Sequence, residues 1–472
     1  MQISTTLSLQ QSSSSTRISV LRAILLALAI TFCTTSLPAQ SSLNEYVEFA
    51  LSNNIVLKQK QVSLEKATYA LNEAKGLFLP NAALSASYTT GAGGRYLDFP
   101  VGDMLNPVYS TLNQLTNSNA FPTIENIKAQ LNPKNYYDAK VRISMPLVNS
   151  DIYYNKEIKK ELVKISQNEL DIYKRELILN VKQAYYSYLM ALEVEKIYQQ
   201  ALILVEKNRE VNESLQRNGS GLPANVLRSK SEVESVKAQL ANARKDIANA
   251  RSYFNFLLNR QLNDAIAEDI SYYKELESLG IKSTNTGIEN REELNLAAKA
   301  IKIAELQSSM SKSYWLPKVS GFADLGAQAD NFKFSSRAPY SLVGIQLEVP
   351  LFSGFQNRSK VSSSKASYRN AVLEKQNIRN ALMLTAQSSS NTVQSCFSEY
   401  KSAAAQLKAA QAYFNLVESG YRNGVNSLIE FLDARNLLTQ ANVKSAITAF
   451  STLQAIAKLE RETSAYQINP NN

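Results

Sequence analysis

The side chains that perform most enzymatic chemistry are scarce in this chain of 472 residues. It contains no histidine and only two cysteines, Cys33 and Cys396. The absence of histidine excludes Ser-His-Asp and Cys-His nucleophiles, the HExxH zinc helix and imidazole proton shuttles. Two cysteines are too few for a disulfide scaffold or a thiolate metal site, and we interpret Cys396 as a small buried apolar residue. The sequence therefore predicts a protein that is not an enzyme and that needs no cofactor or metal.

One acidic pair has a spacing that could act on ions. Glu430 and Asp433 stand three positions apart on a predicted helix just after Gly424, so both carboxylates share one helix face. In an assembly of three copies, the carboxylates gathered around the axis would attract cations and form a selective constriction. The alternative is an ordinary acidic helix start, which the helix dipole favours.

Long helices must position these residues. Residues 150–217 contain neither Pro nor Gly, and as an α-helix they would extend about 100 Å. After Pro223, apolar residues recur every seven positions, which is typical of helices packed side by side as coiled coils. The two series of this repeat are Val226, Val233, Leu240, Ile247 and Phe254, and Ser229, Val236, Ala243, Ala250 and Leu257.

Four short segments alternate apolar and polar residues with the two-residue period of β-strands. Segments 141–145 and 343–349 alternate clearly, and 84–88 and 319–324 are weaker partners. Strands with one apolar and one polar face are typical of membrane barrels, whereas a small soluble hairpin would be polar on its outward face. Four strands cannot close a barrel, and an open sheet edge is not tolerated in lipid. Two copies would supply eight strands, largely filled by side chains, and three would supply twelve around an aqueous lumen. The polar inward residues favour a lumen, so the sequence predicts an oligomer, and a through-channel favours a homotrimer.

The chain repeats one plan twice, which predicts an internal duplication. Pro146 and Pro350 are 204 residues apart, and Gly219 and Gly424 are 205 apart. We expect a first repeat over 40–265, an equatorial linker over 266–289, a second repeat over 290–465 and a tail over 466–472. The first strand pair carries an insertion, 94–135, which we interpret as an ordered outer loop that covers the barrel mouth.

The first 39 residues have the pattern of a secretory signal peptide. Arg17 and Arg22 precede an apolar run at 23–30, and Ala39 allows cleavage. Phe32 stands before Cys33, where a lipoprotein signal needs a small residue, so no lipid anchor is expected. The net charge of +10 is spread along the chain, which indicates a solvated surface rather than a partner made of nucleic acid.

The chain resembles the TolC-type outer membrane efflux proteins along essentially all of its mature length. The resemblance depends on the segment 42–54, on Leu-Pro pairs at 79–80 and 316–317, on the segment 349–354 (Val-Pro-Leu-Phe-Ser-Gly), and on Gly424 followed by 427–435. It implies a mainly α fold with a small membrane β part, namely a trimeric α-barrel of long helices and a twelve-stranded β-barrel. It also implies a Gram-negative outer membrane location that extends into the periplasm.

The resemblance further implies a passive duct for drugs, toxic compounds or secreted proteins. Its partners would be a periplasmic adaptor (membrane fusion) protein, an inner-membrane RND, ABC or MFS transporter, and outer membrane lipid. The alternative is a coiled-coil structural or adhesive protein of the envelope, which explains the helices but not strands with apolar outer faces.

The same resemblance assigns roles to the ends of the helices. It places Glu430 and Asp433 at the periplasmic aperture, and it makes Tyr421 a residue that holds the closed tip by hydrogen bonds between neighbouring helices. Asn426 and Asn225 stand where charged partners of this tyrosine occur in the family, so the closing contacts are differently built. The turns that would meet the adaptor contain Gly219, Gly221, Leu222, Gly424, Val425 and Ser427.

Overall fold

The computed structural model describes residues 43–132, 135–268, 276, 287–330 and 336–465. The predicted signal peptide, most of the predicted linker and the tail at 466–472 lie outside the described residues. The described chain is mainly helical with a small β part, as predicted, and divides into two compact units. Each unit takes segments from both halves of the sequence repeat. Among the described helices, none is both long and apolar enough to cross a membrane.

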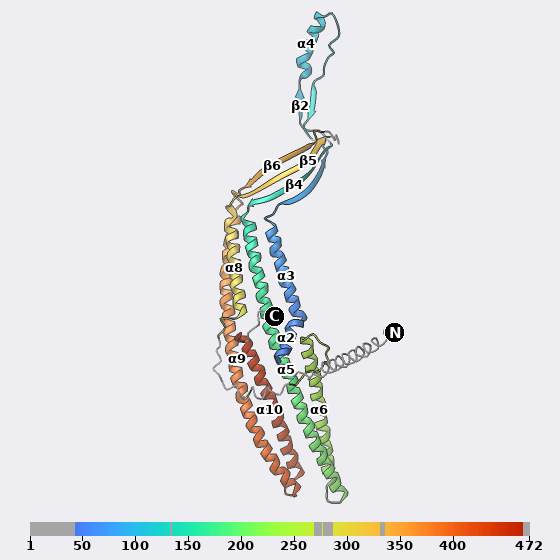
Figure 1. Cartoon of the computed structure of the whole chain (residues 1–472), viewed down its shortest axis with the longest axis vertical. Coiled ribbons are helices and arrows are strands. Elements are labelled where there is room, and N and C mark those ends of the chain that lie inside the picture. The colour runs from blue at the N-terminus through green and yellow to red at the C-terminus, as the bar shows by residue number, and fades with distance from the viewer. Residues whose placement is uncertain (1–42, 133–134, 269–275, 277–286, 331–335, 466–472) are drawn as a thin grey trace, which may run out of the picture. The chain divides into compact units, whose positions relative to one another are not determined.

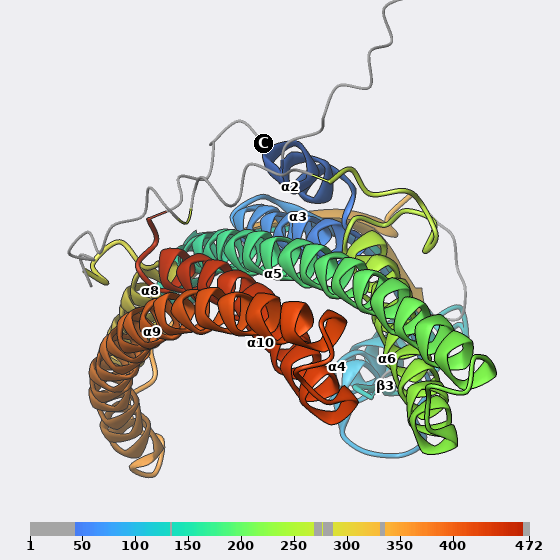
Figure 2. The same ribbon diagram turned by 90° about the horizontal axis from the view of Figure 1, so that it is seen from below.

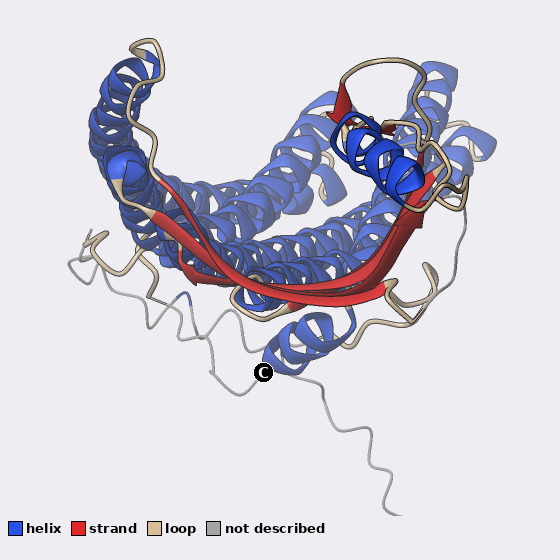
Figure 3. Ribbon diagram, turned by 90° about the horizontal axis from the view of Figure 1, so that it is seen from above, coloured by secondary structure: helices blue, strands red, loops and turns tan. Residues whose placement is uncertain are grey.

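The unit made of residues 63–167 and 296–375 contains a four-stranded antiparallel sheet. Its strands are β1 (Asn81–Thr89), β4 (Tyr136–Val148), β5 (Lys318–Asp330) and β6 (Pro339–Glu348), in the order β1-β4-β5-β6. Each of the four predicted segments falls in one of these strands, although β6 ends one residue before Val349. The sheet is strongly curved (Figure 3), and within the described residues β1 and β6 each pair on one side only.

The register of the sheet separates an apolar face from a largely polar one. Leu84, Val141 and Leu325 lie opposite one another, and Ile143, Ala323 and Val343 form the next row of the same face. On this face Leu84 is 78% exposed, and Val343 is 81% exposed. A single chain therefore leaves the apolar side of its only four-stranded sheet uncovered in the part of the chain that the structure describes.

The opposite face carries hydrogen-bonded charges. Arg142 donates two hydrogen bonds to Asp324, at 2.7 and 2.6 Å, and its guanidinium lies over the ring of Phe322. Lys140 Nζ and the Tyr340 hydroxyl both donate to the Asp138 carboxylate, at 2.9 and 2.8 Å. These two clusters contain as many acids as bases, so their charges balance within this polar face.

Helices begin or end where the sequence places proline near the sheet. Helix α3 (Ile55–Gly76) ends before Pro80, and α8 (Glu292–Lys312) is followed by a single 3₁₀ turn, Ser313–Trp315. Leu316 then adopts an extended conformation, because the ring of Pro317 disfavours a helical residue before it.

The predicted outer loop is a folded hairpin. It contains β2 (Tyr96–Phe99), α4 (Val101–Leu115) and β3 (Ile127–Gln130), and β2 pairs antiparallel with β3. The sequence predicted order here but not these elements. Thr89 and Tyr136, which flank the insertion, are paired in the four-stranded sheet, so both ends of the hairpin leave the same end of that sheet.

The second unit, residues 43–62, 168–268, 276, 287–295 and 376–465 of the described chain, is helical. Helix α2 spans Leu43–Asn53. The long helices α5 (Ser150–Arg217) and α9 (Gln356–Arg422) continue into this unit, where they form hairpins with α6 (Pro223–Leu257) and α10 (Leu428–Glu462) (Figures 1 and 2). Helix α5 has the bounds that the sequence predicts, residues 150–217.

The core of the helical unit follows the predicted seven-residue repeat. Of the ten positions predicted on α6, nine are buried and Ala250 is half-buried. At one end of the seam, the rings of Tyr46, Tyr185 and Phe254 meet with centroids 5.1 to 5.9 Å apart. Rings at these separations add to the stability that their burial provides.

Candidate functional site

The two helical hairpins end in turns of the same geometry. Gly219 and Gly424 adopt positive φ angles of 75° and 77°, and the amides of the following residues donate back to the carbonyls of Leu215 and Gly420. This is the Schellman arrangement, which closes a helix with a left-handed residue and favours glycine there. Each hairpin therefore reverses sharply, at the glycines that the sequence analysis identified.

The residues after each glycine begin the returning helix in different ways. A Cβ on Gly221 would lie 2.7 Å from the backbone nitrogen of Gln216, so this position excludes any larger residue. Leu222 then caps α6 with no side-chain hydrogen bond, and Pro223 occupies the first turn. Ser427 instead forms a capping box with Glu430 at the start of α10.

Glu430 is bound locally by this capping box. The Ser427 amide donates to its carboxylate at 2.6 Å, and the Asn426 side chain donates at 3.4 Å. These hydrogen bonds, led by the one from the Ser427 backbone, lower the pKa of Glu430. Its carboxylate is therefore held in the charged form while it remains exposed to solvent.

Asp433 is also exposed, one turn further along α10. Within the described residues, no hydrogen bond or ion pair engages its carboxylate. Glu430 and Asp433 thus present two charges on one exposed stretch of α10, as their spacing predicts. The alternative that the sequence left open, an acidic helix start, also describes Glu430.

A groove of about 760 Å³ lies between the ends of the two hairpins. Of the predicted site residues, it brings together Gly221, Leu222, Tyr421, Gly424 and Ser427. Gly219, Val425, Glu430 and Asp433 do not line it. The turns and the acidic pair therefore lie close in sequence, but they present different surfaces.

Tyr421 links the two hairpins inside one chain. Its ring stacks on Phe431, with centroids 4.9 Å apart, and its hydroxyl accepts a hydrogen bond from Asn212 of α5 at 3.2 Å. The sequence did not identify Asn212. The only signal is a pair of asparagines four residues apart, Asn208 and Asn212, at buried positions of an otherwise apolar helix face.

The two tip asparagines that the resemblance singles out have contacts other than Tyr421. Asn426 donates to Glu430, and the backbone carbonyl of Asn225 accepts from Ser229 at 2.8 Å. Ser229 also donates to Asn208 at 3.3 Å. The hydrogen bonds around Tyr421, Asn212 and Ser229 join neutral groups, and such bonds are weaker than charge-assisted ones.

A buried ion pair makes a second link between the hairpins. Arg435 of α10 donates to Glu232 of α6 at 2.8 Å, and the Arg435 side chain is only 2% exposed. Burial lowers the pKa of Arg435, and the Glu232 carboxylate opposes that change. Arg435 belongs to the segment 427–435 that carries the family resemblance, but its partner could not be predicted from the sequence.

Apolar side chains at the turns face solvent. Leu222 is 65% exposed, Val425 80% and Ile429 75%. Large exposed apolar groups that gather in one place mark contact surfaces for other proteins.

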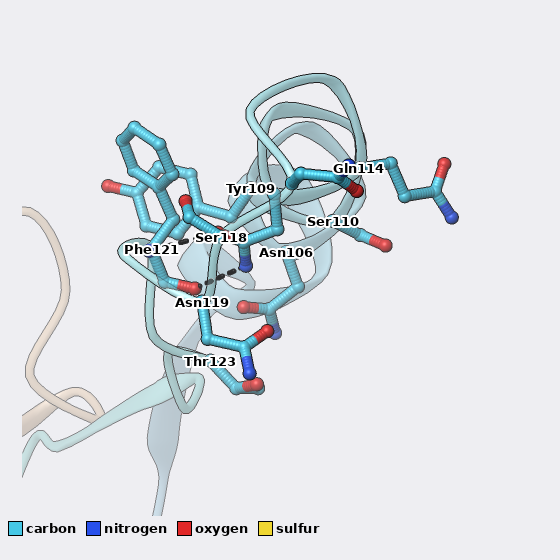
Figure 4. Close-up of a pocket in the computed structure, with 10 residues that line it drawn as sticks. Asn106, Tyr109, Ser110, Gln114, Ser118, Asn119, Phe121 and Thr123 are labelled. Atoms are coloured by element: carbon cyan, nitrogen blue, oxygen red, sulfur yellow. Dashed lines mark hydrogen bonds between the residues drawn. The ribbon is translucent and has the colours of Figure 1, made fainter.

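A second cavity, of about 510 Å³, belongs to the outer hairpin. Its lining residues, all uncharged, include Tyr109, Ser110, Gln114, Asn119 and Thr123 (Figure 4).

Cys396 of helix α9 is half-buried, and burial raises the pKa of its thiol. A protonated thiol is a poor nucleophile, so Cys396 is unsuited to catalysis.

Comparison with known proteins agrees with this architecture. The sequence profile of the outer membrane efflux protein family matches residues 47–260 and 284–463. Outer membrane protein TolC of Escherichia coli (strain K12) is 21% identical over 491 residues, covering 95% of this chain and 90% of that protein.

Solved structures show the same fold. The CmeC outer membrane channel of Campylobacter jejuni has a TM-score of 0.71 at 17% identity, with 89% of this chain and 85% of that chain covered. The open state of the Neisseria gonorrhoeae MtrE outer membrane channel has a TM-score of 0.71 at 16% identity, with coverage of 89% and 88%. The chain therefore belongs to the outer membrane efflux protein family.

Proposed function

We propose that three copies of this chain form a duct that conducts exported compounds from the periplasm through the outer membrane. Its family makes the chain an outer membrane efflux channel protein rather than an enzyme. In the proposed trimer the sheets close a twelve-stranded β-barrel, and the long helices form an α-barrel in the periplasm. The exported compounds are drugs, toxic compounds or secreted proteins.

The two-faced, four-stranded sheet carries this proposal. Its apolar face suits lipid, and its polar face suits an aqueous lumen. Strands β1 and β6 have unpaired edges within the described chain, and unpaired backbone groups cost several kcal/mol each in lipid. Pairing β1 of one copy with β6 of the next removes both edges, and three copies give a barrel wide enough for a water-filled channel.

Aromatic residues where the strands meet the helices support a membrane boundary there. Trp315 is 61% exposed, Phe352 76% and Phe355 67%. Aromatic side chains gather at the interface between lipid and water, because their rings are apolar while the headgroup region is partly wet. This position agrees with helices on the periplasmic side and strands in the bilayer.

At the periplasmic end, we assign Glu430 and Asp433 to the aperture. Three copies would place six carboxylates around the axis, and the lowered pKa of Glu430 keeps three of them ionised in mild acid. The Tyr421–Asn212 hydrogen bond and the Arg435–Glu232 ion pair would hold the two hairpins together in the resting tip.

The turns are the proposed contact with a periplasmic adaptor. Leu222 and Val425 are exposed, and Gly219, Gly221, Gly424 and Ser427 fix the shape of the backbone around them. The adaptor would join the duct to an inner-membrane RND, ABC or MFS transporter, which supplies the energy for export.

A pair of neighbouring substitutions in β6 tests the proposal. Val343 lies on the apolar face, whereas Leu342 lies on the polar face opposite Asp324. If the sheet is in lipid, Val343→Lys costs about 2–4 kcal/mol at the bilayer midplane and reduces assembled, conducting protein, while Leu342→Lys leaves it largely intact. Channel activity in planar bilayers and heat-resistant trimer on gels are the measurements. Equal tolerance of both lysines would contradict the proposal and favour a coiled-coil protein outside the membrane.

A further inference from the structure

Helix α4 of the outer hairpin has two faces with different chemistry. One face is bonded to the chain that returns to β3. The side-chain amide of Asn106 accepts from the backbone nitrogen of Ile124 at 2.8 Å and donates to its carbonyl at 2.9 Å. Asn113 does the same with Phe121, at 3.1 and 2.8 Å. Each of these two side-chain amides thus forms the paired hydrogen bonds that a neighbouring backbone would form. Both lie on the same face of α4, and they fix the helix against the returning chain.

The other face of α4 is apolar and largely exposed, although Val101 and Leu112 on it are half-buried. Val101, Leu105, Val108, Leu112 and Leu115 follow one another at steps of four, three, four and three residues. Val108 is 51% exposed, Leu115 is 78% exposed, and the adjacent Met104 is 71% exposed. Steps of four and three are the spacing of a coiled-coil seam, which packs against other helices of the same kind.

The strands that carry α4 also lack cover. In the β2–β3 pair, Leu97 and Phe99 share a face with Ala129 and Ile127, and Leu97, Phe99 and Ile127 are 45% to 55% exposed. A two-stranded sheet is at best marginally stable alone in water, so an apolar face on it needs a partner. Both α4 and the β2–β3 pair therefore have an apolar face that needs a packing partner.

We infer that the apolar face of α4, residues 101, 104, 105, 108, 112 and 115, packs on the α4 helices of the other two copies in the trimer. The inference rests on the proposed function, because the trimer brings three hairpins to the exit end of one barrel. The three packed helices form a cap that narrows the outer mouth, in addition to the constriction at the periplasmic tip.

The charge of α4 favours other copies of this helix, rather than a lipid surface, as its packing partner. Asp103 is the only charged residue of α4, and its carboxylate accepts a hydrogen bond from Asn126 at 2.9 Å. Helices that lie on membrane surfaces are instead rich in Lys and Arg on their polar face. With no basic residue and one bonded acid, three copies of α4 can approach one another without strong repulsion, whereas α4 has little to attract it to anionic lipid.

Cysteine cross-linking tests this packing in the full chain. In a background with Cys33→Ser and Cys396→Ser, single cysteines are placed at Val108, on the apolar face, and at Ser110, which lines the polar cavity two residues away. Both positions are exposed in one chain. A short bifunctional thiol reagent applied to outer membranes should cross-link Val108→Cys subunits several-fold more than Ser110→Cys subunits. Leu115→Cys is the second variant, for use if Val108→Cys assembles poorly.

Native mass spectrometry of the same variants counts their subunits. This count separates the inferred cap of α4 helices from the proposed trimeric duct. A trimer in which Val108→Cys cross-links no more than Ser110→Cys overturns the cap and leaves the proposed function standing. Failure to form a trimer overturns the proposed function itself. Shielding of Val108→Cys from a water-soluble maleimide by lipid vesicles, without cross-links between subunits, would assign the face to the membrane and also overturn the cap.

A conductance measurement provides an independent readout. If the helices cap the mouth, Val108→Asn with Leu115→Asn should raise the open fraction of single channels several-fold, because the amides disfavour a closely packed apolar seam. Ser110→Asn is the matched control on the other face. An unchanged open fraction in a normally assembled trimer would count against the cap.

Discussion

The chemical roles of single side chains at the ends of the helical hairpins depend on their local hydrogen bonds. Glu430 is both a charge and half of a capping box, in which its Oε2 atom accepts hydrogen bonds from the Ser427 amide and the Asn426 side chain. Its spacing from Asp433 could be recognised in the sequence, but its bonds to Ser427 and Asn426 could not, because they depend on the conformation of the turn. The role of Asn212 could not be predicted from the sequence, because its hydrogen bond to Tyr421 joins residues 209 positions apart.

The negative charge of Glu430 can be removed without removing the capping box at the start of α10. A glutamine at position 430 preserves the capping box, whereas alanine would destroy it. We expect Glu430→Gln with Asp433→Asn to leave assembly intact and to weaken the block of bilayer conductance by multivalent cations. Glu430→Ala, in contrast, should also destabilise the start of α10. Block that is unaffected by the double substitution would remove both residues from the constriction.

The same block should depend on pH in a defined direction. The pKa of Glu430 lies below its ordinary value of 4.5, so the carboxylate stays ionised as the pH falls to that value. Cation block should therefore persist at pH 5 and weaken only in stronger acid, where the Glu430 carboxylates become protonated. Titration of block in single channels measures this directly, and loss of block between pH 7 and pH 5 would contradict the assignment.

The buried ion pair between α10 and α6 should be costly to break. Arg435→Met leaves Glu232 with only its ion pair to the exposed Arg228, at 2.9 Å, and breaking a buried pair costs at most about 3–5 kcal/mol. The temperature at which helical circular dichroism is lost should fall clearly. Lys237→Met, which removes the exposed pair with Glu234, is the matched control and should cost about 1 kcal/mol or less. Equal effects of the two substitutions would show that Arg435 contributes no more than a surface charge.

At the scale of elements, regular periodicity was the reliable signal. Residues 150–217 have no helix breaker and form one helix, and the seven-residue repeat after Pro223 becomes the buried seam of α6. Helix α4 escaped prediction because Pro107 and Gly102 interrupt its pattern and because amides rather than apolar residues bind it to the returning chain.

The turn glycines should be required for their conformation alone. No atom lies within 4 Å of a Cβ built on Gly219 or Gly424, so alanine there meets no obstacle except the positive φ. The left-handed conformation costs a residue with a side chain about 1–2 kcal/mol. We expect Gly424→Ala to lower thermal stability and adaptor binding and Gly424→Asn to do so less. Gly76→Ala, which has equal space and no positive φ, should be harmless; equal loss in all three variants would contradict this explanation.

A charged network anchors the start of α8 to the end of α10. Arg291, only 1% exposed, donates to Glu293 at 2.7 Å and to Glu462 at 2.6 Å. Burial alone would raise the pKa of Glu293, but its hydrogen bonds with Arg291 prevail and lower it to about 2. Because the pKa in the folded protein is depressed, the stabilisation is complete above about pH 4.5 and is lost as the pH falls toward 2.

This network gives a prediction for acid stability. Glu293→Gln should lower the thermal midpoint at neutral pH, by an amount corresponding to roughly 3 kcal/mol, and the difference from the parent should shrink below pH 4.5. Glu305→Gln, which breaks only the exposed pair with Lys302, is the control. A difference between Glu293→Gln and parent that is constant from pH 7 to pH 3 would contradict the assigned pKa.

As a single chain, the described part of the molecule leaves an apolar sheet face and two strand edges uncovered. The number of strands and their alternation could be predicted from the sequence, because a two-residue period and the cost of open edges in lipid are local and general rules. The proposed packing of subunits at the outer mouth could not be predicted, since it depends on a hairpin whose elements the sequence did not reveal. The uncovered apolar face of the sheet and its two free edges are the features that only an assembly resolves.

Counting the subunits of the purified full-length protein in detergent, by native mass spectrometry, tests this central claim most directly. The account predicts a stable complex of three chains, in which cysteines placed along β1 of one copy form disulfides with cysteines along β6 of another. A stable single chain, or a complex in which these two edges never cross-link, would contradict it.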